Sequence, residues 1–113
     1  MKFEVGDLVR TKKDIPHGNN CGNSIGIITQ LMTPDNGEFK KGNASVQTEK
    51  YQIENIFKDA GKLHEMIYLY AKQKGCRTAS HIVTSNNEDE LILIAKKDKV
   101  RKFLMEKTIV DFL

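Results

Sequence analysis

The stretch that decides the fold is Phe3-Glu4-Val5-Gly6-Asp7-Leu8-Val9-Arg10, with Ser24-Ile25-Gly26-Ile27-Ile28-Thr29-Gln30-Leu31 further along the chain. Gly6-Asp7 supplies turn chemistry, because glycine tolerates positive φ and aspartate can bond the backbone that follows it. We therefore expect a first strand from about residue 8. The β-branched residues of the second stretch predict a half-buried strand, in which Gly26 indicates a bulge or a close approach of another backbone.

A third run, Ala44-Ser45-Val46-Gln47-Thr48, alternates between two kinds of side chain and leads into Tyr51-Gln52-Ile53. Such alternation predicts a strand with one face toward a core and the other toward water. Clusters of Gly, Asn and Pro separate the three runs. The first half of the chain is therefore expected to form a series of short β-strands.

This order of parts resembles a small SH3-like barrel of the kind that carries KOW motifs in transcription and translation factors. Val5-Gly6-Asp7-Leu8-Val9 matches the opening strand of that family, and Ser24 to Ile28 matches its second element. The segment from Val46 to Ile53 looks like the last two strands. The resemblance implies a barrel over residues 1–57 and an association with nucleic acid. Ile27 departs from the KOW pattern, since members that contact RNA usually carry a polar or basic residue there.

The second half has a helical period. Between Lys58 and Lys74, apolar residues recur at spacings of three and four, and Gly75 stands where a helix commonly ends. Residues 81–84 and 90–95 predict two strands, which we expect to form a hairpin. Residues 97–106 predict a second helix, and Ile109 to Leu113 fits either its end or a last strand.

These elements predict an α+β fold, an N-terminal SH3-like β-barrel with a C-terminal α-β-β-α extension over residues 58–113 packed on it. The link between residues 53 and 57 has no Pro, Gly or Ser-rich spacer. We therefore expect the barrel and the extension to form one continuous unit.

The net charge of +3 resides in the second half of the chain. Up to Glu54, seven basic residues face seven acidic ones, whereas from Asn55 onward eleven face eight. Basic residues cluster most densely between Lys96 and Lys107, where six meet two acidic residues. Phosphate neutralisation supplies most non-specific affinity for nucleic acid, so this segment and a lysine pair in an earlier loop are the candidate contacts. They are Lys40, Lys41, Lys96, Lys97, Lys99, Arg101 and Lys102. The alternative interpretation of the segment from Lys96 is a solvated helix face.

Two loops, residues 15–23 and 33–43, are the expected sites of contact with a protein partner. The first is long for a hairpin connection and rich in Gly and Asn. The second places an aromatic ring beside two lysines, where it can stack a nucleic-acid base or pack on its own domain. The candidate partner-binding residues are Ile15, His17, Asn19, Asn20 and Phe39.

The sequence lacks the parts of the common enzymes. His64-Glu65 has no second histidine for a zinc helix, and no nucleophile elbow or phosphate-binding loop is present. Cys21 and Cys76 are expected to be reduced thiols, and the histidines match no compact metal-ligand spacing. We expect no enzyme activity, no cofactor, no metal and no small-molecule substrate. Because no apolar stretch approaches the length of a membrane span and the N-terminus has no signal-peptide pattern, we expect a cytoplasmic protein with no membrane partner.

The sequence thus predicts a non-catalytic binding module. One interpretation is a nucleic-acid-associated module of transcription or translation, whose partner is a nucleic acid or a ribonucleoprotein. The alternative is a protein-interaction module or small regulator, of the kind that phages and mobile elements encode, which docks on a specific larger protein. The neutral barrel half and Ile27 suit this alternative.

Overall fold

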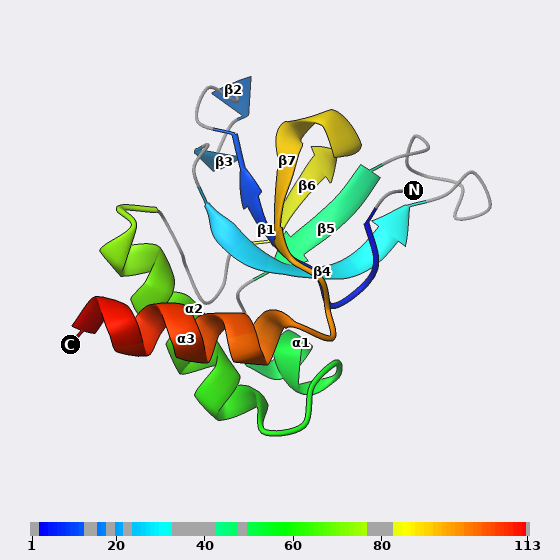
Figure 1. The fold of residues 1–113 in the computed structure, drawn as a ribbon. Coiled ribbons are helices and arrows are strands. Elements are labelled where there is room, and N and C mark those ends of the chain that lie inside the picture. The colour runs from blue at the N-terminus through cyan, green and yellow to red at the C-terminus, as the bar shows by residue number, and fades with distance from the viewer. Residues whose placement is uncertain are drawn as a thin grey trace.

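The computed structural model describes residues 3–12, 16–17, 20–21, 24–32, 43–47, 50–76 and 83–112. In this part of the chain a five-stranded antiparallel sheet lies against helices in a small α+β fold (Figure 1). The coarse α+β prediction is therefore confirmed.

The strand order across the main sheet is β6-β5-β4-β1-β7. Strand β1 (Leu8–Thr11) begins where the Gly6-Asp7 turn predicts, and it pairs with β4 (Ile25–Met32) through Leu8 opposite Ile27. Strand β5 (Asn43–Gln47) follows next to β4. Strands β6 (Val83–Asn87) and β7 (Leu91–Ala95) form the two edges. The segments 1–57 and 58–113 therefore share one sheet.

The sheet does not close into the barrel that the resemblance implies. The predicted closing strand at Tyr51 to Ile53 is wrong, because residues Lys50–Glu54 form a short helix, α1. Ile53 is fully buried, but it reaches the core from this helix, in the cluster that contains Leu63 of α2 and Ile27 of β4. The irregularity expected at Gly26 lies elsewhere: Gly26 pairs regularly with Val9, and the register of β4 on β5 shifts between Ile28 and Gln30.

The predicted hairpin of residues 81–84 and 90–95 is also wrong. Strand β6 pairs with β5, and β7 crosses to the opposite edge to pair with β1. The short 3₁₀ helix η2 (Glu88–Glu90) makes this change of direction, and the Asn87 and Glu90 side chains cap it reciprocally. One edge of β1 pairs with β4, which leaves its other edge available to a further strand. The apolar run of β7 pairs with this second edge, and Leu91 and Ala95 are thereby buried.

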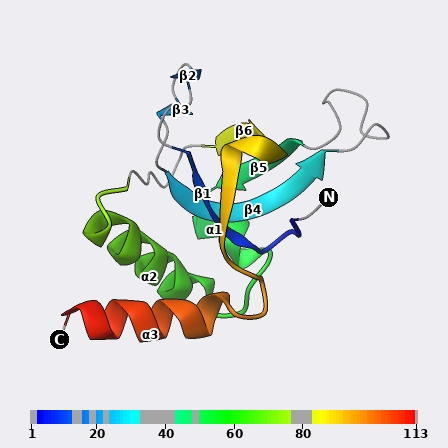
Figure 2. The same ribbon diagram turned by 45° about the horizontal axis from the view of Figure 1, so that its top comes forward.

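Both long helices form where the periodicity predicts them. Helix α2 (Ala60–Gln73) ends just before Gly75, whose φ of 69° provides the left-handed turn, while Cys76 N–H donates to the Ala71 carbonyl. Helix α3 (Val100–Phe112) continues past Ile109, so the ambiguous end of the chain is helical as far as Phe112. The two helices lie together beneath the sheet (Figure 2) and touch through an edge-to-face contact of Tyr70 with Phe103 at 5.5 Å.

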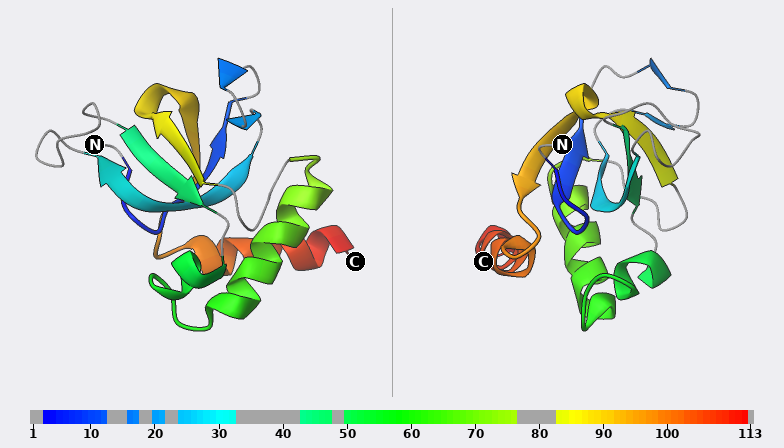
Figure 3. Two further views of the ribbon diagram at one scale, coloured as in Figure 1. Left: turned by 180° about the vertical axis from the view of Figure 1, so that it is seen from behind. Right: turned by 90° about the vertical axis from the view of Figure 1, so that its right-hand side faces the viewer.

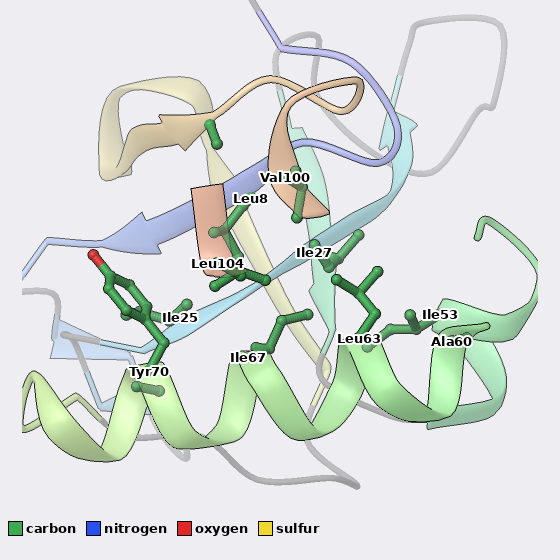
Figure 4. Packing of buried hydrophobic residues seen from close by; sticks show 12 residues of the cluster. Leu8, Ile25, Ile27, Ile53, Ala60, Leu63, Ile67, Tyr70, Val100 and Leu104 are labelled. Atoms are coloured by element: carbon green, nitrogen blue, oxygen red, sulfur yellow. The ribbon is translucent and has the colours of Figure 1, made fainter. Parts of the chain in front are cut away.

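Alternating strand residues divide the core into two clusters. Leu8 and Ile27 point to one face of the sheet, where α2 and α3 cover them with side chains such as Leu63, Ile67 and Leu104 (Figure 4). Their neighbours Val9 and Ile28 point to the other face and pack with residues of β5 and β7, among them Ala44, Val46 and Leu91. Consecutive residues of β1 and β4 are therefore buried on opposite faces of the sheet.

Candidate functional site

The basic segment begins with two lysines that bind acidic residues of the N-terminal turn. Lys96 Nζ donates to Asp7 Oδ2 at 2.9 Å and lies 3.5 Å from Glu4 Oε1, while Lys97 Nζ lies 3.0 Å from Glu4 Oε2. The Asp7 side chain is fully buried and also accepts hydrogen bonds from the backbone N–H groups of Glu4 and Lys97, both at 2.9 Å. The two lysines predicted to contact nucleic acid therefore hold the start of the chain against the end of β7.

These contacts shift the pKa values of Glu4 and Lys96 in opposite directions. The hydrogen bond from Lys97, with the positive charges of Lys96 and Lys97, holds the pKa of Glu4 below its usual value. The hydrogen bond to Asp7 raises the pKa of Lys96. Both shifts favour the charged forms. The two positive charges of Lys96 and Lys97 therefore largely neutralise the two negative charges of Glu4 and Asp7.

The remaining predicted cations of α3 differ in their surroundings. Arg101 donates through Nη2 to the carbonyl oxygen of Lys58, which joins α3 to the turn before α2. Lys102 is exposed and lies 4.0 Å from Glu106, one turn along the helix. Lys99 is exposed one turn before Lys102. We call Lys58, Lys62, Lys99, Arg101 and Lys102 the α2–α3 basic face.

A hollow of about 390 Å³ lies within this face, between the first turn of α2 and the middle of α3. Lys62 and Arg101 line it from the two helices, and Met66 and Met105 supply its apolar wall. Asp59 is the one acidic residue among its described lining residues. Two cations from different helices beside apolar surface can hold an anionic group next to a flat or aliphatic one.

A second hollow, of about 500 Å³, lies on the side of α2 that faces away from the sheet. Its described lining residues are His64, Glu65, Tyr68 and Leu69, and the last two expose large apolar side chains. The apolar spacing of the sequence predicts only the core-facing stripe of α2. Tyr68 and Leu69 fall outside its buried stripe of residues 63, 67, 70 and 71, and this position was the signal for a second face.

No protein-family model, curated protein or solved structure matches this chain significantly. Its geometry and charge are therefore the basis for any functional proposal.

The predicted loop residues are only partly placed. Ile15, Asn19, Phe39, Lys40 and Lys41 lie outside the described residues. His17 belongs to β2 (Pro16–His17) and pairs with Asn20 of β3 (Asn20–Cys21) in a separate two-stranded sheet. The partner-binding prediction for these loops stays a prediction.

Among the described residues, no group of three or more His, Cys, Asp or Glu side chains is arranged to hold a metal ion. Cys76 is half-buried, and its Sγ lies 3.8 Å from the carbonyl oxygen of Lys74. No helix in the described part of the chain is long and apolar enough to cross a bilayer.

Proposed function

We propose that the protein is a non-catalytic binding module that takes a nucleic acid on the α2–α3 basic face. The hollow lined by Lys62 and Arg101 carries this proposal, because it brings together cations that lie far apart in the sequence. A phosphate group can sit between these two side chains, and the exposed Lys99 and Lys102 add positive charge at the same end of α3. The hydrogen bond from Arg101 to Lys58 supports the same view, since it fixes the guanidinium and leaves further N–H donors available.

Lys96 and Lys97 have a structural role in this proposal. Their ammonium groups are already paired with Asp7 and Glu4, and a phosphate would have to compete with those carboxylates. We therefore expect most of the affinity for nucleic acid to come from Lys99, Arg101 and Lys102, together with Lys58 and Lys62.

For the fold, we infer that the sheet is an open variant of the SH3-like arrangement. In that arrangement consecutive strands pair in order and the last strand returns to the first. The order β6-β5-β4-β1-β7 supports this inference, with α1 and α2 inserted between β5 and β6. Fold alone does not fix a function, so the charge argument remains the basis of the proposal.

The second candidate is a protein-interaction module that docks on a larger protein. The pairing of Lys96 and Lys97 with acidic residues favours it, because the segment presents less free positive charge than its composition indicates.

Binding to fluorescent single-stranded RNA, single-stranded DNA and duplex DNA, measured at several salt concentrations, tests the first candidate. We expect the variant with Lys99→Glu and Lys102→Glu to lose about tenfold or more in affinity, and to show a shallower salt dependence by about one unit of slope per lost phosphate contact. Lys12→Glu is the control, since Lys12 is exposed at the end of β1. No binding near 50 mM salt, or equal losses in the control, would contradict the nucleic-acid proposal and favour the second candidate.

A further inference from the structure

We propose that the outer face of α2, formed by Glu65, Tyr68, Leu69 and Lys72, pairs with the same face of a second copy of this chain. All four residues are exposed. They lie opposite the buried stripe of the helix that contains Leu63 and Ile67. In the view from behind, α2 lies in front of α3 (Figure 3, left), so α3 does not cover the side of α2 that faces the viewer.

The described part of the chain leaves the apolar centre of this face exposed to solvent. Tyr68 and Leu69 are 47% and 41% exposed, and they stand next to each other beside the hollow of about 500 Å³. A large side chain from a partner can enter this hollow. Exposed aromatic and aliphatic groups beside a hollow are typical of the centre of an interface.

The charges around this centre are complementary to themselves. Glu65 precedes Tyr68 by three residues, and Lys72 follows Leu69 by three. If two α2 helices pack antiparallel with the two-fold axis between Tyr68 and Leu69, Glu65 of each copy lies opposite Lys72 of the other. The same register places His64 opposite Gln73 and brings no like charges together. A two-fold interface requires this kind of self-complementary surface, which is why we choose a second copy over an unrelated partner.

A contact made through one helix face is small compared with a standard interface of about 1,600 Å². We therefore expect a reversible dimer with a dissociation constant in the micromolar range or weaker. Such a dimer leaves the α3 part of each basic face available, because Arg101 and Met105 belong to α3, whereas Lys62 stands one turn before Glu65 at the margin of the paired α2 face. Two basic faces on one particle increase the avidity for a long anionic partner.

Sedimentation velocity of the full chain, from about 5 µM to about 500 µM, measures this dimer within the range expected for it. Leu69→Asp should weaken association by about tenfold or more, because it places a carboxylate in the apolar centre. Leu93→Asp is a matched control, since Leu93 on β7 is 40% exposed, close to the value for Leu69. It should leave the dissociation constant within about twofold.

A charge exchange tests the antiparallel register without depending on apolar packing. Glu65→Lys or Lys72→Glu alone places like charges opposite each other and should weaken the dimer by about tenfold. The two substitutions together restore opposite charges and should return the dissociation constant to within about threefold of the original. Failure of the double variant to recover overturns the proposed register. A chain that stays monomeric at every concentration overturns the dimer and leaves the face to a different partner, and disruption by Leu93→Asp instead places the contact on β7.

Discussion

The carboxylate of Asp7 and the ammonium of Lys96, 89 residues apart in the chain, meet at 2.9 Å and join the turn before β1 to the end of β7. The aspartate is buried, whereas the lysine keeps about a third of its side chain exposed. Asp7 also accepts two backbone N–H groups, so a single carboxylate satisfies three donors. The Gly-Asp pair of the opening motif thus anchors the fold at this corner.

Replacing Asp7 with alanine should lower the free energy of unfolding by about 3 kcal/mol, because it leaves two backbone N–H groups without their acceptor and removes a charged hydrogen bond. Urea denaturation followed by circular dichroism measures the change. Asp98→Ala is the matched control, since Asp98 is an exposed acid two residues after Lys96, and it should alter stability by less than about 0.5 kcal/mol. Equal effects of the two substitutions would show that the buried carboxylate is not an anchor.

The pairing of Glu4 with Lys97 and Lys96 predicts a dependence of stability on pH. The pKa of Glu4 is lower in the folded chain than its usual value of 4.5, because Lys97 hydrogen-bonds to its charged form. Its contribution to stability is therefore complete above pH 4.5 and is lost as the pH falls through the lowered folded value. The original chain should be more stable than Glu4→Gln at neutral pH, and the two should converge in acid. A difference that grows in acid would contradict this sign.

The contribution of Lys96 to stability changes with pH in the opposite direction, and it does so at alkaline pH. Its pKa is raised above 10.5 by the hydrogen bond to Asp7, so its contribution is present below 10.5 and disappears as the pH rises through the folded value. The stability difference between the original chain and Lys96→Met should therefore shrink as the pH rises through that alkaline range. Denaturant titrations at a series of pH values measure this difference.

The local parts of the fold were predictable from the sequence. Turn chemistry at Gly6-Asp7 and the β-branched run at Ile25 to Ile28 indicated β1 and β4, and apolar spacing indicated α2 and α3. Strand pairing was not predictable in the same way. The run Leu91 to Ala95 reads equally well as half of a hairpin or as a partner for β1, and only the open edge of β1 decides between them.

The candidate site was predicted from charge density, which does not show which charges are already neutralised. Lys96 and Lys97 belong to the densest basic cluster, yet their acidic partners lie near residue 5. Lys62 stands alone in the sequence and reaches the basic face only because α2 packs against α3. Contacts over long sequence distances therefore determined which cations remain available.

Replacement by alanine should cost different amounts of stability at the two glycines with positive φ, Gly6 and Gly75. Gly6 has a φ of 99°, and a Cβ there would lie 3.0 Å from Lys97 Cβ and 3.4 Å from Ile56 Cγ2. Gly75 has a φ of 69°, and a Cβ there would meet nothing within 4 Å. Gly75→Ala should cost about 1 kcal/mol of backbone strain, whereas Gly6→Ala adds a steric clash and should cost about 2 to 3 kcal/mol. Thermal unfolding of the two variants measures the difference, and equal costs would mean that the neighbours of Gly6 move aside freely.

Asn86 of β6 is a buried polar residue whose replacement should stabilise the protein. Its side chain is 1% exposed opposite Ala44, and neither its Nδ2 nor its Oδ1 has a hydrogen-bond partner among the residues that the structure describes. Because a buried amide without partners loses its hydration, Asn86→Val should raise the free energy of unfolding by about 1 kcal/mol. Thr11→Val is the control: Thr11 is equally buried, but its Oγ1 accepts a hydrogen bond from Ser24 N–H at 2.8 Å, so the same kind of change should destabilise by about 1 to 2 kcal/mol. Urea denaturation measures whether the free energy of unfolding rises or falls in each variant. A lower free energy of unfolding in Asn86→Val would mean that the amide forms hydrogen bonds in the native protein.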